Sequence, residues 1–100
     1  MYAEIRKYTM KNKDELFRKV REEFVPMVSS HAGFIAYYVL DEGSDVIASV
    51  SIFETREEAR ESNRLAADWV KESIASLVAS GPEITEGEVT IAKEGSAPMM

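Results

Sequence analysis

Residues 33–53, with the sequence GFIAYYVLDEGSDVIASVSIF, decide the fold of this chain of 100 residues. Two runs rich in β-branched and aromatic residues, 34–40 and 46–53, flank a polar turn in which Gly43 is free to adopt a positive φ. This pattern predicts a β-hairpin. Both faces of each strand are apolar, whereas a sheet that is wetted on one face alternates apolar with charged residues. We therefore expect both faces of this sheet to be covered.

The segment before the hairpin predicts a strand followed by a helix. Residues 2–9 alternate with a period of two, as a strand does. Asn12 and Glu15 form a capping box, which starts a helix. Pro26 lacks an amide hydrogen and crowds the preceding turn, so we expect a kink or a restart near Val25. The apolar positions of this helix are Leu16, Phe17, Val20, Phe24, Met27 and Val28.

The segment after the hairpin predicts a longer helix. Thr55 and Glu58 form a second capping box, and we expect the helix to run to about Val78 and to stop before Gly81 and Pro82. Its apolar stripe contains one amide, and Leu65 and Trp69 lie on the flank of that stripe. The members of the stripe are Ala59, Asn63, Ala66, Ala67, Val70, Ile74 and Leu77.

The last segment predicts a weaker strand over residues 84–93, with a bulge at Gly87 and with Val89 and Ile91 facing the core. We expect a single domain over residues 1–94. Residues 95–100 are rich in small residues, and we expect a flexible tail there.

The order strand, helix, strand, strand, helix, strand predicts an α+β protein. Its expected form is a ferredoxin-like βαββαβ two-layer sandwich, with an antiparallel four-stranded sheet and both helices on one face. The other apolar face needs a cover, and a second copy of the chain is the simplest one. We therefore expect a homodimer in which two sheets pack as a dimeric α/β barrel. The alternative is a monomer with an exposed apolar patch.

The composition excludes several classes of function. The chain has no cysteine, which removes disulfides, thiolate metal sites and thiol nucleophiles. A net charge of −6 disfavours binding to nucleic acid or to an anionic membrane. The acidic turn 41–45 lacks the spacing of a calcium loop, so we expect no metal site. Because there is no long apolar segment and no signal-peptide pattern, we expect a cytoplasmic protein.

Three stretches resemble the antibiotic-biosynthesis-monooxygenase-like proteins: YAEIRKY at 2–8, GFIAYYV at 33–39 and VSIFE at 50–54, the last followed by a capped helix. The resemblance covers roughly residues 2–93. It implies the fold of the dimeric α/β-barrel superfamily. It does not decide the chemistry, because that family includes cofactor-free oxygenases, haem degraders, isomerases and members without known activity.

The resemblance implies one enzymatic function, a monooxygenase that needs no cofactor and acts on a phenolic or quinol-type aromatic small molecule. Such family members use an Asn and a Trp on the second helix, and Asn63 and Trp69 are of those types. A spacing of six residues sets them about 120° apart around the helix, so they need not line one pocket. The alternative function is a non-catalytic small-molecule-binding or structural dimer.

Three residues are weak catalytic candidates, each with a structural alternative. Asn63 needs hydrogen-bond partners, which backbone, water or a ligand can supply. Trp69 is either core packing or the wall of an aromatic pocket. His31 has a suitable pKa for a general base, or is simply solvated. Because the haem degraders of the family use a His on the second helix and His31 precedes the second strand, we expect no haem and no other cofactor.

Three further residues join Asn63 and Trp69 as candidates for ligand binding. Tyr37 and Tyr38 point to opposite faces of their strand, so one faces the helices and the other the dimer seam; the sequence leaves open which. Arg6 either binds an anion or phenolate, or pairs with Glu4 or a cross-strand acid.

Overall fold

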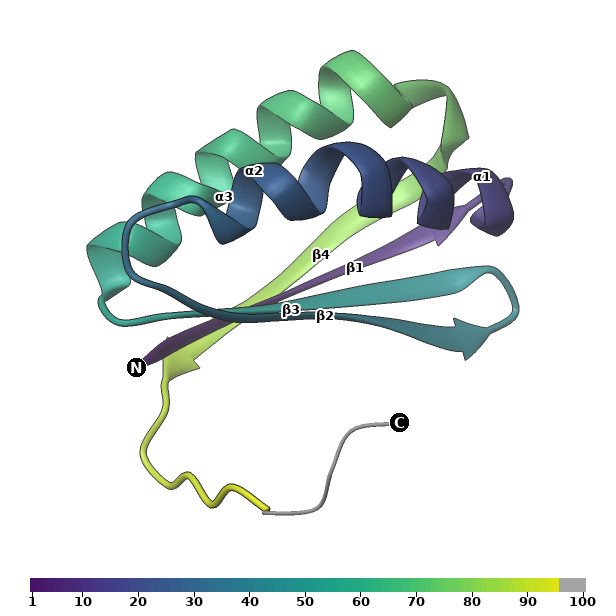
Figure 1. The fold of residues 1–100 in the computed structure, drawn as a ribbon. Helices are drawn as coiled ribbons and strands as arrows, with labels where there is room; N and C mark the ends of the chain where they lie inside the picture. Colours follow the sequence, from purple (N-terminus) through teal and green to yellow (C-terminus); the bar gives the residue numbers. More distant parts are fainter. Residues whose placement is uncertain (96–100) are drawn as a thin grey trace.

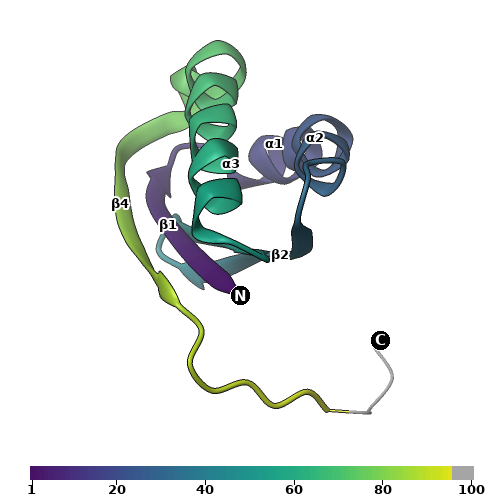
Figure 2. The ribbon, with the colours of Figure 1, turned by 90° about the vertical axis from the view of Figure 1, so that its left-hand side faces the viewer.

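The structure is a computed structural model that describes residues 1–95. Four strands form one antiparallel sheet in the order β2-β3-β1-β4 (Figure 1). Their bounds are β1 Tyr2–Met10, β2 Phe34–Gly43, β3 Val46–Phe53 and β4 Val78–Glu88. Both helical segments cover the same face of the sheet (Figure 2). The predicted ferredoxin-like α+β sandwich is confirmed.

The first helical segment consists of α1 (Lys13–Lys19), a π-helical turn (Val20–Phe24) and α2 (Val25–Ser29). The Asn12 side chain caps it by accepting a hydrogen bond from the Glu15 amide at 3.1 Å. The helix restarts at Val25, as predicted, because Pro26 offers no amide hydrogen to the preceding turn.

The second helical segment consists of α3 (Arg56–Trp69), a π-helical turn (Val70–Ile74) and a 3-10 turn (Ala75–Leu77). The Thr55 side chain caps it. The predicted stripe is wrong at Ala67, which is exposed, and Trp69 is buried in the core rather than on its flank. Within α3 the buried residues are Ala59, Ser62, Ala66 and Trp69, so the stripe is rotated toward Ser62 and Trp69. The π-helical turn that follows holds more residues per turn and brings Ile74 to the same side, which a uniform projection cannot show.

Strand β4 lies six residues earlier than the sequence suggested, beginning at Val78 instead of at 84. Gly81 and Pro82 lie inside this strand, joined by a cis peptide bond, and do not mark the end of the helix. β4 is an edge strand with almost no buried residues, so hydrogen bonding to β1 sets its extent and no apolar period reveals it.

The expectations for Gly87 and Ile91 were also wrong. Gly87 pairs regularly with Ala3, and the irregular pairing of β4 lies near Ser80 instead. Val89 follows the strand, and Ile91 is 89% exposed. Residues 89–95 leave the sheet on the side away from the helices (Figure 1). Residues 96–100 of the expected tail lie outside the described part of the chain.

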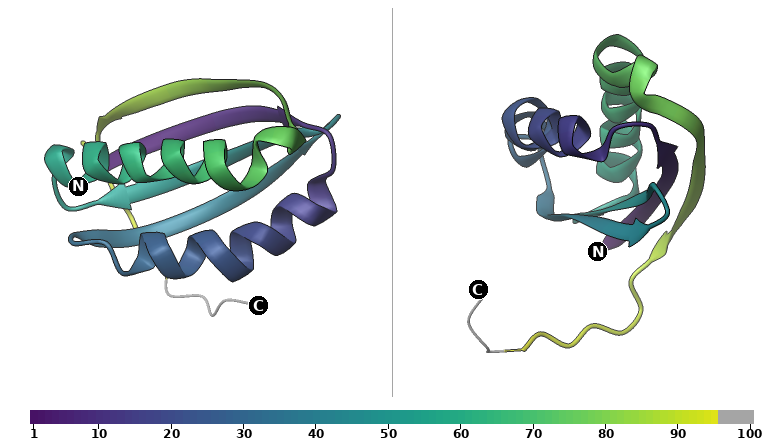
Figure 3. Two further views of the ribbon diagram at one scale, coloured as in Figure 1. Left: turned by 90° about the horizontal axis from the view of Figure 1, so that it is seen from above. Right: turned by 90° about the vertical axis from the view of Figure 1, so that its right-hand side faces the viewer.

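The helix-facing side of β1 is largely polar, although it is buried. The buried residues are Tyr2, Glu4, Arg6, Tyr8 and Met10. Strand β1 packs against α3. The two helical segments run side by side across the sheet (Figure 3). A charged pair is thus enclosed in the core, and this pair positions the site described next.

The opposite face of the sheet is apolar and open. Ile5, Tyr38 and Leu40 are 37%, 52% and 48% exposed on it. Strict alternation fails at the start of β2, where irregular pairing between Phe34 and Ala36 lets the Phe34 ring pack against Phe53 on the helix side, with ring centroids 5.9 Å apart.

Candidate functional site

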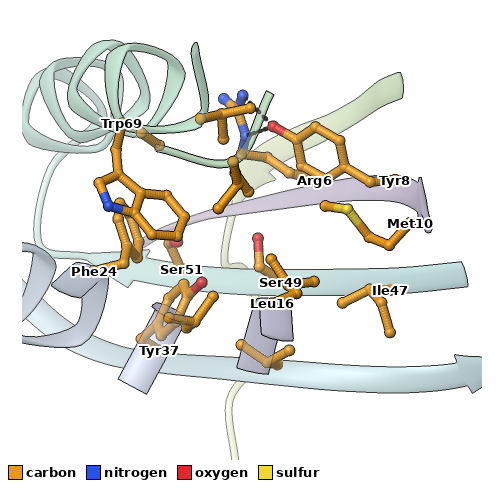
Figure 4. Close-up of a pocket in the computed structure, with 15 residues that line it drawn as sticks. Arg6, Tyr8, Met10, Leu16, Phe24, Tyr37, Ile47, Ser49, Ser51 and Trp69 are labelled. Atoms are coloured by element: carbon orange, nitrogen blue, oxygen red, sulfur yellow. Dashed lines mark hydrogen bonds between the residues drawn. The ribbon is translucent and has the colours of Figure 1, made fainter. Parts of the chain in front are cut away.

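A cavity of about 50 Å³ lies between the helices and the sheet (Figure 4). This volume has room for a few water molecules. A larger cleft of about 410 Å³ adjoins it between the first helical segment and the outer strand β2. The two share Val20, Tyr37 and Val39 in their walls, so these three side chains separate the cavity from the outside.

One wall of the cavity is aromatic. The Phe24 ring lies 5.1 Å from the Trp69 ring and 5.4 Å from the Tyr37 ring, centroid to centroid, with tilted planes. The indole nitrogen of Trp69 donates to Glu23 Oε1 at 3.2 Å, which fixes the ring orientation. Burial raises the pKa of Tyr37 to about 12. Its phenol is therefore neutral at physiological pH and able to donate a hydrogen bond.

The opposite wall carries a buried positive charge on β1. Arg6 is only 6% exposed, and its Nε and Nη2 donate to Tyr8 Oη at 3.2 and 2.7 Å. Its Nη1 donates to Asn63 Oδ1. Glu4 Oε1 lies 3.8 Å from the same Nη1. The arrangement offers a cation, held rigidly, beside an apolar space, which suits an anionic or phenolic oxygen.

Glu4 is the acidic partner of Arg6 and is itself 3% exposed. Burial raises the pKa of Glu4 to about 7, against the opposing effect of the Arg6 charge. Its Oε2 is buried without a hydrogen-bond partner. The sequence offered Glu4 as a partner of Arg6, and the structure confirms this pair. The burial of Glu4 was not predicted, because the alternation in residues 2–9 does not show which face of the strand meets the helices. The two tyrosines that share its parity, Tyr2 and Tyr8, were the available signal.

The structure brings three of the candidate residues to the cavity. Arg6, Tyr37 and Trp69 line it. Asn63 is outside its lining and instead holds Arg6, so its amide has the hydrogen-bond partner that its place in the stripe demands. Of the two tyrosines, Tyr37 faces the helices, whereas Tyr38 lies on the open face.

His31 lies apart from the cavity, in the link before β2. Its ring meets Phe53 edge-on at 5.5 Å between centroids, and its Nδ1 lies 3.0 Å from the carbonyl oxygen of Ala32. Neither contact brings it to the aromatic wall or to Arg6.

Within residues 1–95, no group of three or more His, Cys, Asp or Glu side chains is placed to hold a metal ion. In the same part of the chain, no helix is both long enough and apolar enough to cross a membrane.

No protein-family model and no curated protein matches the chain. Solved structures do. A candidate antibiotic biosynthesis monooxygenase from Nitrosomonas europaea superposes with a TM-score of 0.73 at 16% identity, over 91% of this chain and 100% of that one. SnoaB, a cofactor-independent oxygenase from Streptomyces nogalater, gives 0.72 at 12% identity, over 91% and 94%. MhuD with bound manganese protoporphyrin IX gives 0.71 at 20% identity, over 95% and 100%.

These similarities confirm the fold that the sequence resemblance implied, that of the antibiotic-biosynthesis-monooxygenase-like proteins. One such fold carries an oxygenase in SnoaB and binds a porphyrin in MhuD. The function of this chain must therefore be argued from its own cavity.

Replacing Glu4 with Gln tests the electrostatics of the buried pair. Because the folded-state pKa of Glu4 is raised, the folded protein holds this proton more tightly than the unfolded chain does. The protonated Glu4 carboxyl therefore adds to the free energy of unfolding. This stabilisation is fully present below about pH 4.5 and is lost as the pH rises through about 7. We expect the wild type to lose about 1–3 kcal/mol relative to Glu4→Gln over that range, measured by urea unfolding.

The matched control is Glu72→Gln, at an exposed position in the second π-helical turn. This variant should follow the wild type at every pH. Parallel stability curves for the wild type and Glu4→Gln would contradict a raised pKa at Glu4.

Proposed function

We propose that the chain is a monooxygenase that needs no cofactor and oxidises a phenolic or quinol-type aromatic small molecule. The observation that carries the proposal is the pairing of an aromatic wall with the buried Arg6 guanidinium across one cavity. The similarity in fold to SnoaB supports it. An aromatic ring is larger than the 50 Å³ cavity, so the substrate would also occupy the adjoining cleft once Val20, Tyr37 and Val39 move aside. Phe24, Tyr37 and Trp69 would then contact the ring, and Arg6 with Tyr8 would bind its oxygen.

The reaction uses O₂ as the oxidant. The substrate phenol first loses its proton, and the phenolate passes one electron to O₂. The two radicals then join in a C–O bond at a ring carbon that carries hydrogen. The resulting peroxide anion takes back the proton that the phenol released and becomes a hydroperoxide. Loss of water then breaks the O–O bond and the C–H bond and leaves a carbonyl, so one oxygen atom stays in the product and the other leaves as water.

The protein favours this sequence by electrostatics and by exclusion of water. A buried cation stabilises the phenolate more strongly than water-exposed charges do, because the surroundings of the cavity are apolar. The neutral Tyr37 phenol can donate a further hydrogen bond to an oxygen that gains negative charge. Both effects act before O₂ reacts, and they raise the concentration of the reactive anion.

The alternative is a non-catalytic small-molecule-binding or structural dimer. The contacts of Arg6 with Glu4, Tyr8 and Asn63 favour this alternative, because a buried cation that is paired and hydrogen-bonded also serves stability alone. The two functions differ in whether a phenol that binds in the cavity also consumes oxygen.

We also propose that the protein is a cytoplasmic homodimer formed by its domain at residues 1–94. The open sheet face with Ile5, Tyr38 and Leu40 supports the dimer, since a second copy would cover it. The two sheets would then pack as a dimeric α/β barrel, which leaves the cavity of each subunit on the helix side.

Filling the cavity should weaken both ligand binding and oxygen consumption. Ala66 lines the cavity and its neighbour Ala67 is exposed, so Ala66→Leu and Ala67→Leu form a matched pair. We expect Ala66→Leu to lower both binding and oxygen consumption with naphthols and quinols at least about tenfold, at unchanged or higher thermal stability, because it fills empty space. Ala67→Leu should behave as the wild type.

Equal binding by the two variants would show that the ligand lies elsewhere. Wild-type binding without oxygen consumption, by contrast, would favour the non-catalytic alternative.

A charge on the open sheet face should separate the subunits. We expect Tyr38→Glu to sediment as an 11.2 kDa species at micromolar concentration, whereas the wild type sediments at twice that mass. The control is Ile91→Glu, at another exposed apolar position, which should leave the dimer intact. A wild type that sediments as a monomer would contradict the dimer.

A further inference from the structure

The orphaned carboxylate oxygen of Glu4 is the feature that the proposed reaction has not used. Glu4 is 3% exposed, and its Oε2 has no hydrogen-bond partner. Its other oxygen lies 3.8 Å from Arg6 Nη1, beyond hydrogen-bonding distance. A buried carboxylate held this loosely is free to accept a proton.

The strand register places the Ser51 side chain next to Glu4, on the side of the cavity. Glu4 on β1 is directly opposite Ser51 on β3, and Ser51 is directly opposite Tyr37 on β2. Side chains directly opposite each other have Cβ atoms about 4.5–5.5 Å apart. Ser51 also lines the cavity, and Figure 4 shows it on the strand between Tyr37 and Arg6. Its hydroxyl can both accept and donate a proton.

The charges around Glu4 come from two strands of the sheet and from α3. Arg6 on β1 favours its charged form, and Glu86, opposite it on β4, disfavours that form. Tyr2 donates to Glu86 at 3.0 Å, and Arg60 of α3 lies 3.6 Å from the same oxygen. Burial outweighs these charges and raises the pKa of Glu4 to about 7, which suits a group that takes up and releases a proton near neutral pH.

We propose that Glu4 is the internal proton acceptor of the cavity, taking the hydroxyl proton of a bound phenol through the Ser51 hydroxyl while the resulting phenolate pairs with Arg6. This inference rests on the proposed function, since it names the base for its first step. The phenol O–H bond breaks, and Ser51 receives that proton and passes its own to Glu4. No group is oxidised or reduced in this step. The net charge of the buried site is unchanged, so no proton needs to leave through the apolar walls.

Proton counting during binding tests the proposal. At pH 8.5, 4-nitrophenol is an anion in solution, and its binding against Arg6 should force Glu4 to take up a proton. We expect the wild type to take up about one proton per bound anion, measured by titration calorimetry in two buffers of different ionisation heat. Glu4→Gln should bind the anion with no uptake, and Glu72→Gln should match the wild type.

Binding without proton uptake in the wild type, or equal uptake in Glu4→Gln, would overturn the proposal. If Glu4→Gln fails to fold, the ¹³C chemical shift of the Glu4 carboxyl in the wild type is measured instead. A change to the shift of the protonated form on adding 4-nitrophenol supports the proposal, and an unchanged shift refutes it. Proton uptake without oxygen consumption by any phenol would leave Glu4 as the acceptor and reject only the monooxygenase. Absence of binding would reject both.

Discussion

Burial of the Arg6 guanidinium beneath the two helices is the constraint on which the site depends. A charge taken out of water is costly unless it is paired and hydrogen-bonded. Glu4 and Tyr8 on the same strand and Asn63 on α3 meet that need. The amide that interrupts the apolar stripe of the second helix is thereby explained, because it joins that helix to the polar face of β1.

The cavity exists because small side chains face this charge. Ser49 and Ser51 on β3 and Ala66 on α3 leave space between Arg6 and the aromatic wall. β1 lies inside the sheet, between β3 and β4, so the charged pair is shielded on both sides. A packed core would have filled this space with larger residues. The buried polar residues of β1 and these small residues together leave a cavity in a place where a hydrophobic core would be fully packed.

The sequence predicted the fold well, because strand alternation, two capping boxes and a hairpin turn are local signals. The bounds of β4 were not predicted, because the edge strand Val78–Glu88 is almost entirely exposed and shows no alternation of apolar and polar residues. The site was predicted in part, since Arg6, Tyr37 and Trp69 were named as candidates and line the cavity. The hydrogen bond between Asn63 and Arg6 was not predicted, because it depends on how the helix packs on the sheet. Glu4 was named as a partner of Arg6, but its burial was not predicted, because a charged residue in an alternating strand ordinarily faces water.

We propose that the buried network of Glu4, Arg6, Tyr8 and Asn63 serves the cavity rather than stability. The double variant Glu4→Gln/Arg6→Met tests it most directly, because an apolar replacement of a buried pair is often neutral or stabilising. Two quantities are measured for the wild type and the double variant: the free energy of unfolding at pH 8 and the affinity for 4-nitrophenolate. We predict stability within about 1 kcal/mol of the wild type or above it, and affinity at least about tenfold lower. A loss of several kcal/mol with unchanged affinity would contradict the account.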